Sequence, residues 1–220
     1  MGLEILVDII LPELPDVNCH FEDGFTCLAA VASGNRVSIV KKLLELGVDI
    51  DLPTKDRRLT PLHLAVGNAC EETVEILVAA GASLHSRLCS GTTPFYRAAR
   101  GGSIRILSLL HEKGSEVDAT TWDNWTPLIE AVENSHESAV KLLLIWGANP
   151  KQCSRYGSIP LEMACHLARR NIYCMLEAAV GDLLGVPSFL RNSTYPSAQG
   201  SYQHVDDDPD SDSETVWWDY

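Results

Sequence analysis

Side chains whose types and spacing would suit catalysis or metal binding are sparse in this chain. The sequence contains no Gly-x-Ser-x-Gly, no phosphate-binding glycine loop, no His-Glu-x-x-His and no Gly-x-Gly-x-x-Gly. An enzyme site would have to be assembled from residues without a motif, such as His111, Cys89 and Asp123. The seven cysteines include no Cys-x-x-Cys pair, and the adjacent Cys165 and His166 would point in different directions on a helix. We therefore expect no enzyme, no metal site and no cofactor.

Aromatic and charged residues that could bind a protein are more conspicuous, because they fall in four short turns. Each turn precedes a Thr-Pro pair, or Ile-Pro in the last case, by three to five residues. Trp122 and Trp125 flank one turn, where a large aromatic side chain buries little within its own unit, so we expect both to anchor a partner. For either tryptophan alone, packing onto the adjacent turn is an equal alternative. The other turn residues that we expect to contact a partner are Arg57, Arg58, Cys89, Asn124 and Tyr156.

Four charged residues on two predicted helices offer a second candidate surface. Arg97 and Arg100 on one helix stand one helix spacing from Glu130 and Glu133 on the next. These side chains could form ion pairs between units, which contribute little net stability at a surface, or a polar strip that binds a partner. We favour the pairing and keep all four as candidate binding residues.

The elements that must position these residues recur at a fixed interval. Pro61, Pro94, Pro127 and Pro160 are each 33 residues apart, and a weaker copy, Thr26-Cys27-Leu28, lies before them. Glycines that follow leucine-rich runs keep nearly the same interval, at Gly47, Gly81, Gly114 and Gly147. A fixed period of this length indicates stacked repeats rather than one globular core.

Each repeat is predicted to contain two helices. Threonine caps the first helix through its hydroxyl group, and the following proline takes the first helical position, where its missing N–H costs nothing. Leu62 and Ala65 then share one face, and the second helix has apolar residues at spacings of three and four, as in Val74 and Leu77. Glycine ends the second helix, because a left-handed conformation is cheap only for glycine.

The segment Thr60-Pro61-Leu62-His63-Leu64-Ala65, the Leu-Leu-x-x-Gly helix ends and Gly147-Ala148-Asn149 resemble ankyrin repeats, across roughly residues 3–180. The resemblance implies an all-α solenoid of stacked helix-turn-helix units. Its β-hairpin fingers would project nearly at right angles, and the fingers and first helices would form a concave face. It also implies that the chain binds proteins, and that the imidazole of His63 bonds neighbouring groups of the fold. We interpret Tyr96, at the equivalent position of the next repeat, as structural too.

The ends of the repeat array depart from the pattern. Leu3-Glu4-Ile5-Leu6-Val7 looks like the second half of a repeat with a rather apolar outer face, so we favour a shortened chain over a natural cap. In the last unit Ile159 replaces the capping threonine and Gly181 displaces the terminating glycine, as in a C-terminal cap. The division that we expect is a partial repeat at 1–20, ankyrin repeats at 21–54, 55–87, 88–120 and 121–153, a divergent capping repeat at 154–184 and a disordered acidic tail at 185–220.

The chain is acidic, and acidic residues concentrate in its last part. The formal net charge is −13, and residues 201–220 hold seven acidic residues and no Lys or Arg. This balance opposes binding to nucleic acid or an anionic membrane, and a partner selected by charge should have a basic surface. No segment is long and apolar enough for a membrane span. The acidic segment could be a solubilising tail, a short binding motif with interleaved aromatic residues, or, at Ser211, a kinase substrate.

Three functions remain open from the sequence. The first is a noncatalytic adaptor that binds a protein partner through the fingers and the concave face. The second is a signalling or transcriptional regulator, since an ankyrin domain before an acidic segment is similar in outline to the inhibitors of NF-κB. The third is a ubiquitin-ligase substrate-recognition subunit, because residues 186–191 faintly resemble a suppressor-of-cytokine-signalling box, without its Leu-Cys and later proline elements. The scattered, odd number of cysteines favours a reducing intracellular compartment, cytoplasmic or nuclear, and we expect a monomer.

Overall fold

The computed structural model describes residues 17–22 and 24–183. Within these ranges the regular secondary structure is helical, apart from one isolated β-bridge between His20 and Thr26. The helices are, in chain order, α2 (Cys27–Ser33), α3 (Val37–Glu45), α4 (Pro61–Gly67), α5 (Glu71–Ala79), α6 (Pro94–Gly101), α7 (Ile104–Glu112), α8 (Pro127–Glu133), α9 (Glu137–Ile145), α10 (Pro160–His166) and α11 (Arg170–Leu183).

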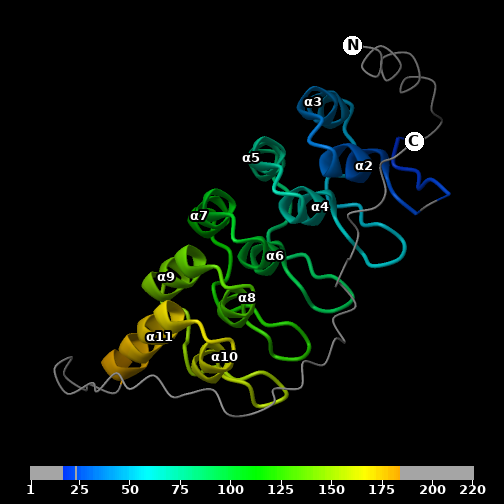
Figure 1. Cartoon of the computed structure of the whole chain (residues 1–220). Helices are drawn as coiled ribbons and strands as arrows, with labels where there is room; N and C mark the ends of the chain where they lie inside the picture. The colour runs from blue at the N-terminus through cyan, green and yellow to red at the C-terminus, as the bar shows by residue number, and fades with distance from the viewer. Residues whose placement is uncertain (1–16, 23, 184–220) are drawn as a thin grey trace.

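The helices form two rows that run along the length of the molecule (Figure 1). The first helices of the repeats, α2, α4, α6, α8 and α10, make the row beside the projecting loops, and the second helices make the other row. Each first helix packs against its own second helix and against the first helices of the neighbouring repeats. The arrangement confirms the predicted solenoid of stacked helix-turn-helix units.

Threonine hydroxyl groups start four of the first helices, as the sequence predicts. The Oγ1 atoms of Thr26, Thr60, Thr93 and Thr126 each accept a hydrogen bond from the backbone N–H three residues later, at 3.1–3.4 Å. Proline follows the cap at the start of α4, α6, α8 and α10. Ile159 stands at the cap of α10 and makes no such bond, since its side chain has no hydroxyl group.

Glycine ends the second helices of the regular repeats but not the last one. Helices α3, α5, α7 and α9 are each 9 residues long, and a glycine with a φ between +74° and +94° follows shortly after each. Helix α11 has 14 residues and runs through Gly181 to Leu183. The displaced glycine of the last repeat therefore lies inside the helix rather than at its end.

One apolar core runs through the helix pairs. Leu62 and Ala65 of α4 and Val74 and Leu77 of α5 are completely buried, and their equivalents in the other repeats are buried with them. Cys70 belongs to this core, and burial raises the pKa of its thiol, so that it stays a small neutral group. Because the buried faces of successive repeats touch, the core is continuous along the stack.

The loops that project from the row of first helices are the fingers, at residues 54–59, 87–92, 121–125 and 154–158. Backbone bonds close each finger across its base, for example from Thr54 N–H to Leu59 O at 2.8 Å and from Thr121 N–H to Trp125 O at 3.0 Å. In the described part of the chain the fingers are thus hairpin-like turns rather than two-stranded ladders.

Backbone bonds also join each finger to its neighbour. The N–H groups of Cys89, Trp122 and Arg155 donate to the carbonyl groups of Arg57 (3.3 Å), Ser90 (3.1 Å) and Asp123 (2.7 Å) of the preceding finger. The N–H group of Lys55, in the first of the four fingers, donates to the carbonyl group of Gly24 at 3.1 Å, in the turn before α2. Each bond spans one repeat, so the fingers form a connected row instead of moving independently.

Three sequence predictions lie outside the described residues. These are the half-repeat at residues 3–7, the disordered acidic tail at 185–220 and the resemblance at residues 186–191 to a suppressor-of-cytokine-signalling box. They stay predictions from the sequence.

Ser115, just after α7, is a polar residue at a position where the adjoining repeats have alanine. Its buried side-chain oxygen has no hydrogen-bond partner among the described residues, and the equivalent residues of the adjoining repeats are the buried Ala82 and Ala148. A buried hydroxyl group without a partner costs free energy, so Ser115→Ala should raise the free energy of unfolding by about 1 kcal/mol in urea denaturation.

Ser154→Ala is the matched control for this substitution. Ser154 is equally buried, but its Oγ accepts the N–H of Ser158 at 3.2 Å. The control should therefore lose about 1 kcal/mol. Equal losses in both variants would show that Ser115 contributes a hydrogen bond after all.

Candidate protein-binding surface

Trp122 stands at the tip of the finger 121–125 and is 63% exposed, yet the neighbouring finger holds it in place. Its indole N–H donates to the carbonyl oxygen of Cys89 at 2.8 Å. The guanidinium carbon of Arg87 lies 5.6 Å from the centre of the indole ring, within the range of a cation–π contact. Trp122 therefore packs onto the adjacent finger, as one alternative from the sequence has it, and still presents most of its surface to solvent.

Arg87 and Gly91 make this contact possible. The Arg87 Nη1 atom donates to the carbonyl groups of Gly91 at 2.9 Å and Thr120 at 2.6 Å, which fixes the guanidinium group beneath the ring. Gly91 has a φ of +86°, and a Cβ atom there would lie 2.9 Å from the Trp122 ring. The finger therefore needs glycine at this position both for its backbone conformation and for the close approach of the indole.

Trp125 has a different role. Its half-buried ring packs against the main apolar core, and its backbone N–H donates to the hydroxyl group of Thr121 at 3.2 Å. Replacing Trp125 would disturb the fold as well as any contact with a partner. Trp122 is therefore the tryptophan whose role in binding can be tested separately from its role in folding.

The other predicted finger residues differ in how far they reach solvent. Tyr156 is 60% exposed, Cys89 is exposed and Arg57 is half-buried. Arg58 and Asn124 are exposed and have φ values of +61° and +59°, at positions where the other fingers have glycine. A left-handed conformation costs a residue with a Cβ atom about 1 kcal/mol. The finger backbone therefore sets the direction of these two side chains against their local preference.

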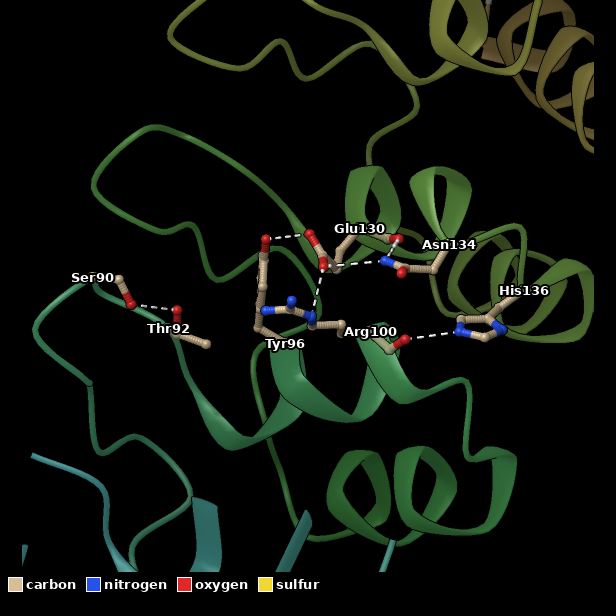
Figure 2. A network of polar contacts seen from close by, with 7 residues as sticks. All are labelled: Ser90, Thr92, Tyr96, Arg100, Glu130, Asn134 and His136. Atoms are coloured by element: carbon tan, nitrogen blue, oxygen red, sulfur yellow. Dashed lines mark hydrogen bonds and ion pairs between the residues drawn. The ribbon is translucent and has the colours of Figure 1, made fainter. Parts of the chain in front are cut away.

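A polar network around Glu130 joins the first helices of two repeats (Figure 2). Glu130 in α8 is 5% exposed, and its carboxylate accepts hydrogen bonds from the Tyr96 hydroxyl group in α6 and from Asn134 Nδ2 at 3.1 Å. The Nε atom of Arg100 lies 3.6 Å from the same carboxylate. The expected ion pair between Arg100 and Glu130 is thus present. A carboxylate can be buried in this way because its charge and lone pairs are satisfied.

The burial of Glu130 limits what it can offer a partner. Its carboxylate is used within the stack, so it orients Tyr96 and Arg100 rather than presenting a surface of its own. Arg97 and Glu133 are half-buried on the same two helices. Contact of these four charged residues with a partner stays a prediction.

Histidines in this region bond to the fold, as the sequence predicts for His63. His63 is completely buried, its Nδ1 lies 2.8 Å from the hydroxyl group of Thr60, and its Nε2 donates to Thr92 O at 3.3 Å. Figure 2 shows a similar hydrogen bond between the next two repeats, where His136 Nε2 donates to the carbonyl oxygen of Arg100 at 2.7 Å.

Sequence reasoning missed Arg87 and the bond between Tyr96 and Glu130. Arg87 lies in the finger before that of Trp122, and the two residues occupy nearly equivalent positions in their repeats. A cation and an aromatic residue at nearly equivalent positions of adjacent repeats could have indicated a cation–π contact. Tyr96 replaces a histidine of the motif, and the next repeat has Glu130 one position after the equivalent residue. An unusual hydroxyl beside an unusual carboxylate could have indicated a bond between repeats.

The residues from which an enzyme site would have to be assembled lie on different elements. His111, in α7, stacks on Trp146 with the ring centres 4.2 Å apart, whereas Cys89 and Asp123 lie in fingers. A hollow lined by Leu84, Phe95 and other residues has a volume of about 130 Å³, below the roughly 300–1,000 Å³ of ligand pockets.

Within residues 17–22 and 24–183, no cluster of three or more His, Cys, Asp or Glu side chains could hold a metal ion. None of the helices described there has both the length and the apolar character that crossing a membrane requires.

Comparison with known proteins identifies the family. A family model described as "Ankyrin repeats (3 copies)" matches residues 2–88 and 81–154, which is more than half of the chain. The helix pairs, the capping threonines and the fingers agree with this match. The chain belongs to the ankyrin-repeat family, whose members generally mediate contacts between proteins.

Individual relatives share the repeats rather than one common function. The chain is 30% identical over 146 residues to the probable 26S proteasome regulatory subunit p28 of Saccharomyces cerevisiae, covering 64% of this chain and 61% of the relative. It is 30% identical over 185 residues to the B-cell lymphoma 3 protein homolog of Mus musculus (65% and 41%). It is 28% identical over 171 residues to the ankyrin repeat protein YahD of Escherichia coli (74% and 84%). The chain thus spans less than two thirds of the first two relatives.

The Glu130 network predicts an unequal response of two tyrosines. Tyr96→Phe removes the hydroxyl group that donates to the buried carboxylate, and should lower the free energy of unfolding by about 2 kcal/mol. Tyr156→Phe alters a side chain that is 60% exposed, and should change the free energy of unfolding by less than about 0.5 kcal/mol. Urea denaturation of both variants measures the difference, and equal effects would contradict the network's role in joining the repeats.

Proposed function

We propose that this chain is a noncatalytic adaptor that holds a protein partner through its fingers and the first-helix face beside them. The proposal is supported by membership of a family that generally mediates contacts between proteins. Trp122 carries the proposal most directly, since it is a large aromatic side chain that is 63% exposed.

The fixed position of Trp122 favours binding. Its indole is already held by Cys89 O and Arg87 before any partner arrives, so little side-chain freedom is lost on association. Aromatic side chains that keep such a position are the usual anchors of protein interfaces. Asn124 adds exposed surface on the same finger, Tyr156 on the next finger, and Arg58 on the finger 54–59.

The net charge of −13 favours the approach of a partner with a basic surface, whereas the basic side chains of the fingers, such as Arg57 and Arg58, would contact acidic groups on it. We further propose a monomer that acts in the cytoplasm or the nucleus, because its free cysteines suit a reducing compartment. The five helix pairs with their connecting fingers would then form one binding module.

A regulatory role is the alternative. It is favoured by the similarity to two relatives, a proteasome regulatory subunit and a B-cell lymphoma 3 protein homolog. It would combine the repeats with the acidic residues of the segment 201–220. Deleting that segment should then change the regulatory output while binding to the repeats is kept, whereas an unchanged output would leave only the adaptor.

Affinity capture with the intact chain tests the adaptor proposal. Trp122→Ala should weaken binding of the captured partner at least roughly tenfold, since a hot-spot aromatic contributes about 2 kcal/mol or more. Ile145→Ala is the matched control, because Ile145 is 67% exposed and lies at the end of α9 in the other row of helices.

Two measurements complete the test. Titration of the purified partner against each variant gives the dissociation constants, and urea denaturation shows whether the Trp122→Ala chain is folded. If the folded Trp122→Ala chain binds every captured partner as tightly as the Ile145→Ala chain does, the finger anchor is wrong.

A further inference from the structure

The row of fingers has a charge opposite to that of the whole chain. We call it the finger edge and define it as residues 54–59, 87–92, 121–125 and 154–158. Its formal net charge is +3, in a chain whose formal net charge is −13. Five basic and two acidic side chains give this charge: Lys55, Arg57, Arg58, Arg87 and Arg155, with Asp56 and Asp123.

The finger edge is also continuous and aromatic. Backbone bonds join its neighbouring fingers, so its charges stay in fixed relation to one another. Trp122 stands between Arg87 of one finger and the ion pair of Arg155 with Asp123, which measures 3.3 Å. Tyr156, on the next finger, is 60% exposed. Such a surface suits an extended acidic segment that also contains aromatic residues.

The chain itself contains a segment of this chemistry, residues 206–220. It combines seven acidic residues with Trp217, Trp218 and Tyr220 and has no Lys or Arg. Its carboxylates match the basic side chains of the finger edge, and its indole rings match the guanidinium groups. Among segments of similar length along the chain, the charge complementarity is therefore strongest here.

The chain between α11 and the acidic segment is long enough for this segment to reach the finger edge. Helix α11 ends at Leu183, so residues 184–205 link it to the acidic segment. When extended, 22 residues span about 70 Å. The finger 54–59 lies three repeats from the last finger, or about 30 Å at the usual spacing of packed helices. The acidic segment can therefore reach every part of the finger edge within one chain.

We propose that residues 206–220 dock on the finger edge of their own chain and cover Trp122. The proposal rests on the proposed function, because it gives the binding surface an internal competitor. A linker of this kind produces an effective concentration on the order of 1 mM. A contact with a dissociation constant of about 0.1 mM would then be occupied about nine-tenths of the time. A protein with a basic surface would release the fingers by binding the acidic segment.

Cys89 provides a reporter within the finger edge. It is exposed, its N–H is bonded to Arg57 O and its carbonyl oxygen to the Trp122 indole. Cys174 is equally exposed in α11, in the other row of helices, and is the matched control. Alkylation of the full-length chain by iodoacetamide, followed site by site by mass spectrometry, gives the accessibility of both thiols.

Neutralising the acidic segment should make the Cys89 thiol more accessible to alkylation. With Asp206, Asp207, Asp208, Asp210 and Asp212 all changed to Asn, alkylation of Cys89 should be about tenfold faster than in the native chain. The rate at Cys174 should not change. Salt at about 1 M, where the Debye length is about 3 Å, should release Cys89 in the native chain as well. Equal rates at Cys89 in all these cases would overturn the proposal.

Arg58→Gly separates docking from a direct effect of charge on the thiol. Other fingers have glycine at this position, so the variant keeps the finger conformation. Loss of a positive charge disfavours the thiolate and by itself slows alkylation, whereas loss of docking accelerates it. Faster alkylation of Cys89 in Arg58→Gly supports docking, and slower alkylation contradicts it.

Two further outcomes are distinct. Protection of Cys89 that increases with protein concentration would mean that the acidic segment of a second copy occupies the finger edge, and would overturn docking within one chain. If Cys89 is never protected while Trp122→Ala still loses its partner, the docking is wrong and the adaptor function stands. If Cys89 is protected and Trp122→Ala binds its partner normally, the docking stands and Trp122 as the anchor of the proposed function is wrong instead.

Discussion

Stacking of the repeats is the interaction on which every other feature of this molecule depends, because a single helix pair leaves apolar surface on both sides. The buried faces around Leu62, Leu107 and Leu143 touch one another in one continuous core. Stability is therefore shared between neighbouring units, and the fingers gain a fixed spacing only because the helices beneath them are packed. A substitution that weakens one interface between repeats is expected to act on the fingers above it.

The same stacking decides which residues meet. Positions separated by about one repeat in the sequence become neighbours, so unlike residues at related positions create new contacts. Arg87 lies against Trp122, and Tyr96 bonds Glu130, without any local sequence motif between the partners. The regular positions build the scaffold, while these departures give one part of its surface an aromatic and charged character.

Features that depend on residues close together in the sequence could be predicted, whereas contacts between repeats could not. The capping bonds of Thr60 and Thr93, and the glycines after the second helices, depend on residues within one turn of chain, so the sequence predicts them well. The orientation of Trp122 depends on a neighbouring finger, which is why the sequence leaves two alternatives open. Gly181 lies inside α11, because one glycine cannot end a helix that neighbouring residues continue. Contact with a partner at the predicted site residues depends on a second molecule, and neither pattern nor fold contains it.

Amide hydrogen exchange at the fingers tests the central claim, that the fingers form a connected row that the stack holds in place. The amides of Cys89, Trp122 and Arg155 donate to the preceding finger, although they lie in loops. In the full-length chain they should be protected to nearly the same degree as the amides of α6 and α8. Exchange at these three amides as fast as in an unstructured peptide, with α6 and α8 still protected, would contradict a connected row and with it a preformed binding surface.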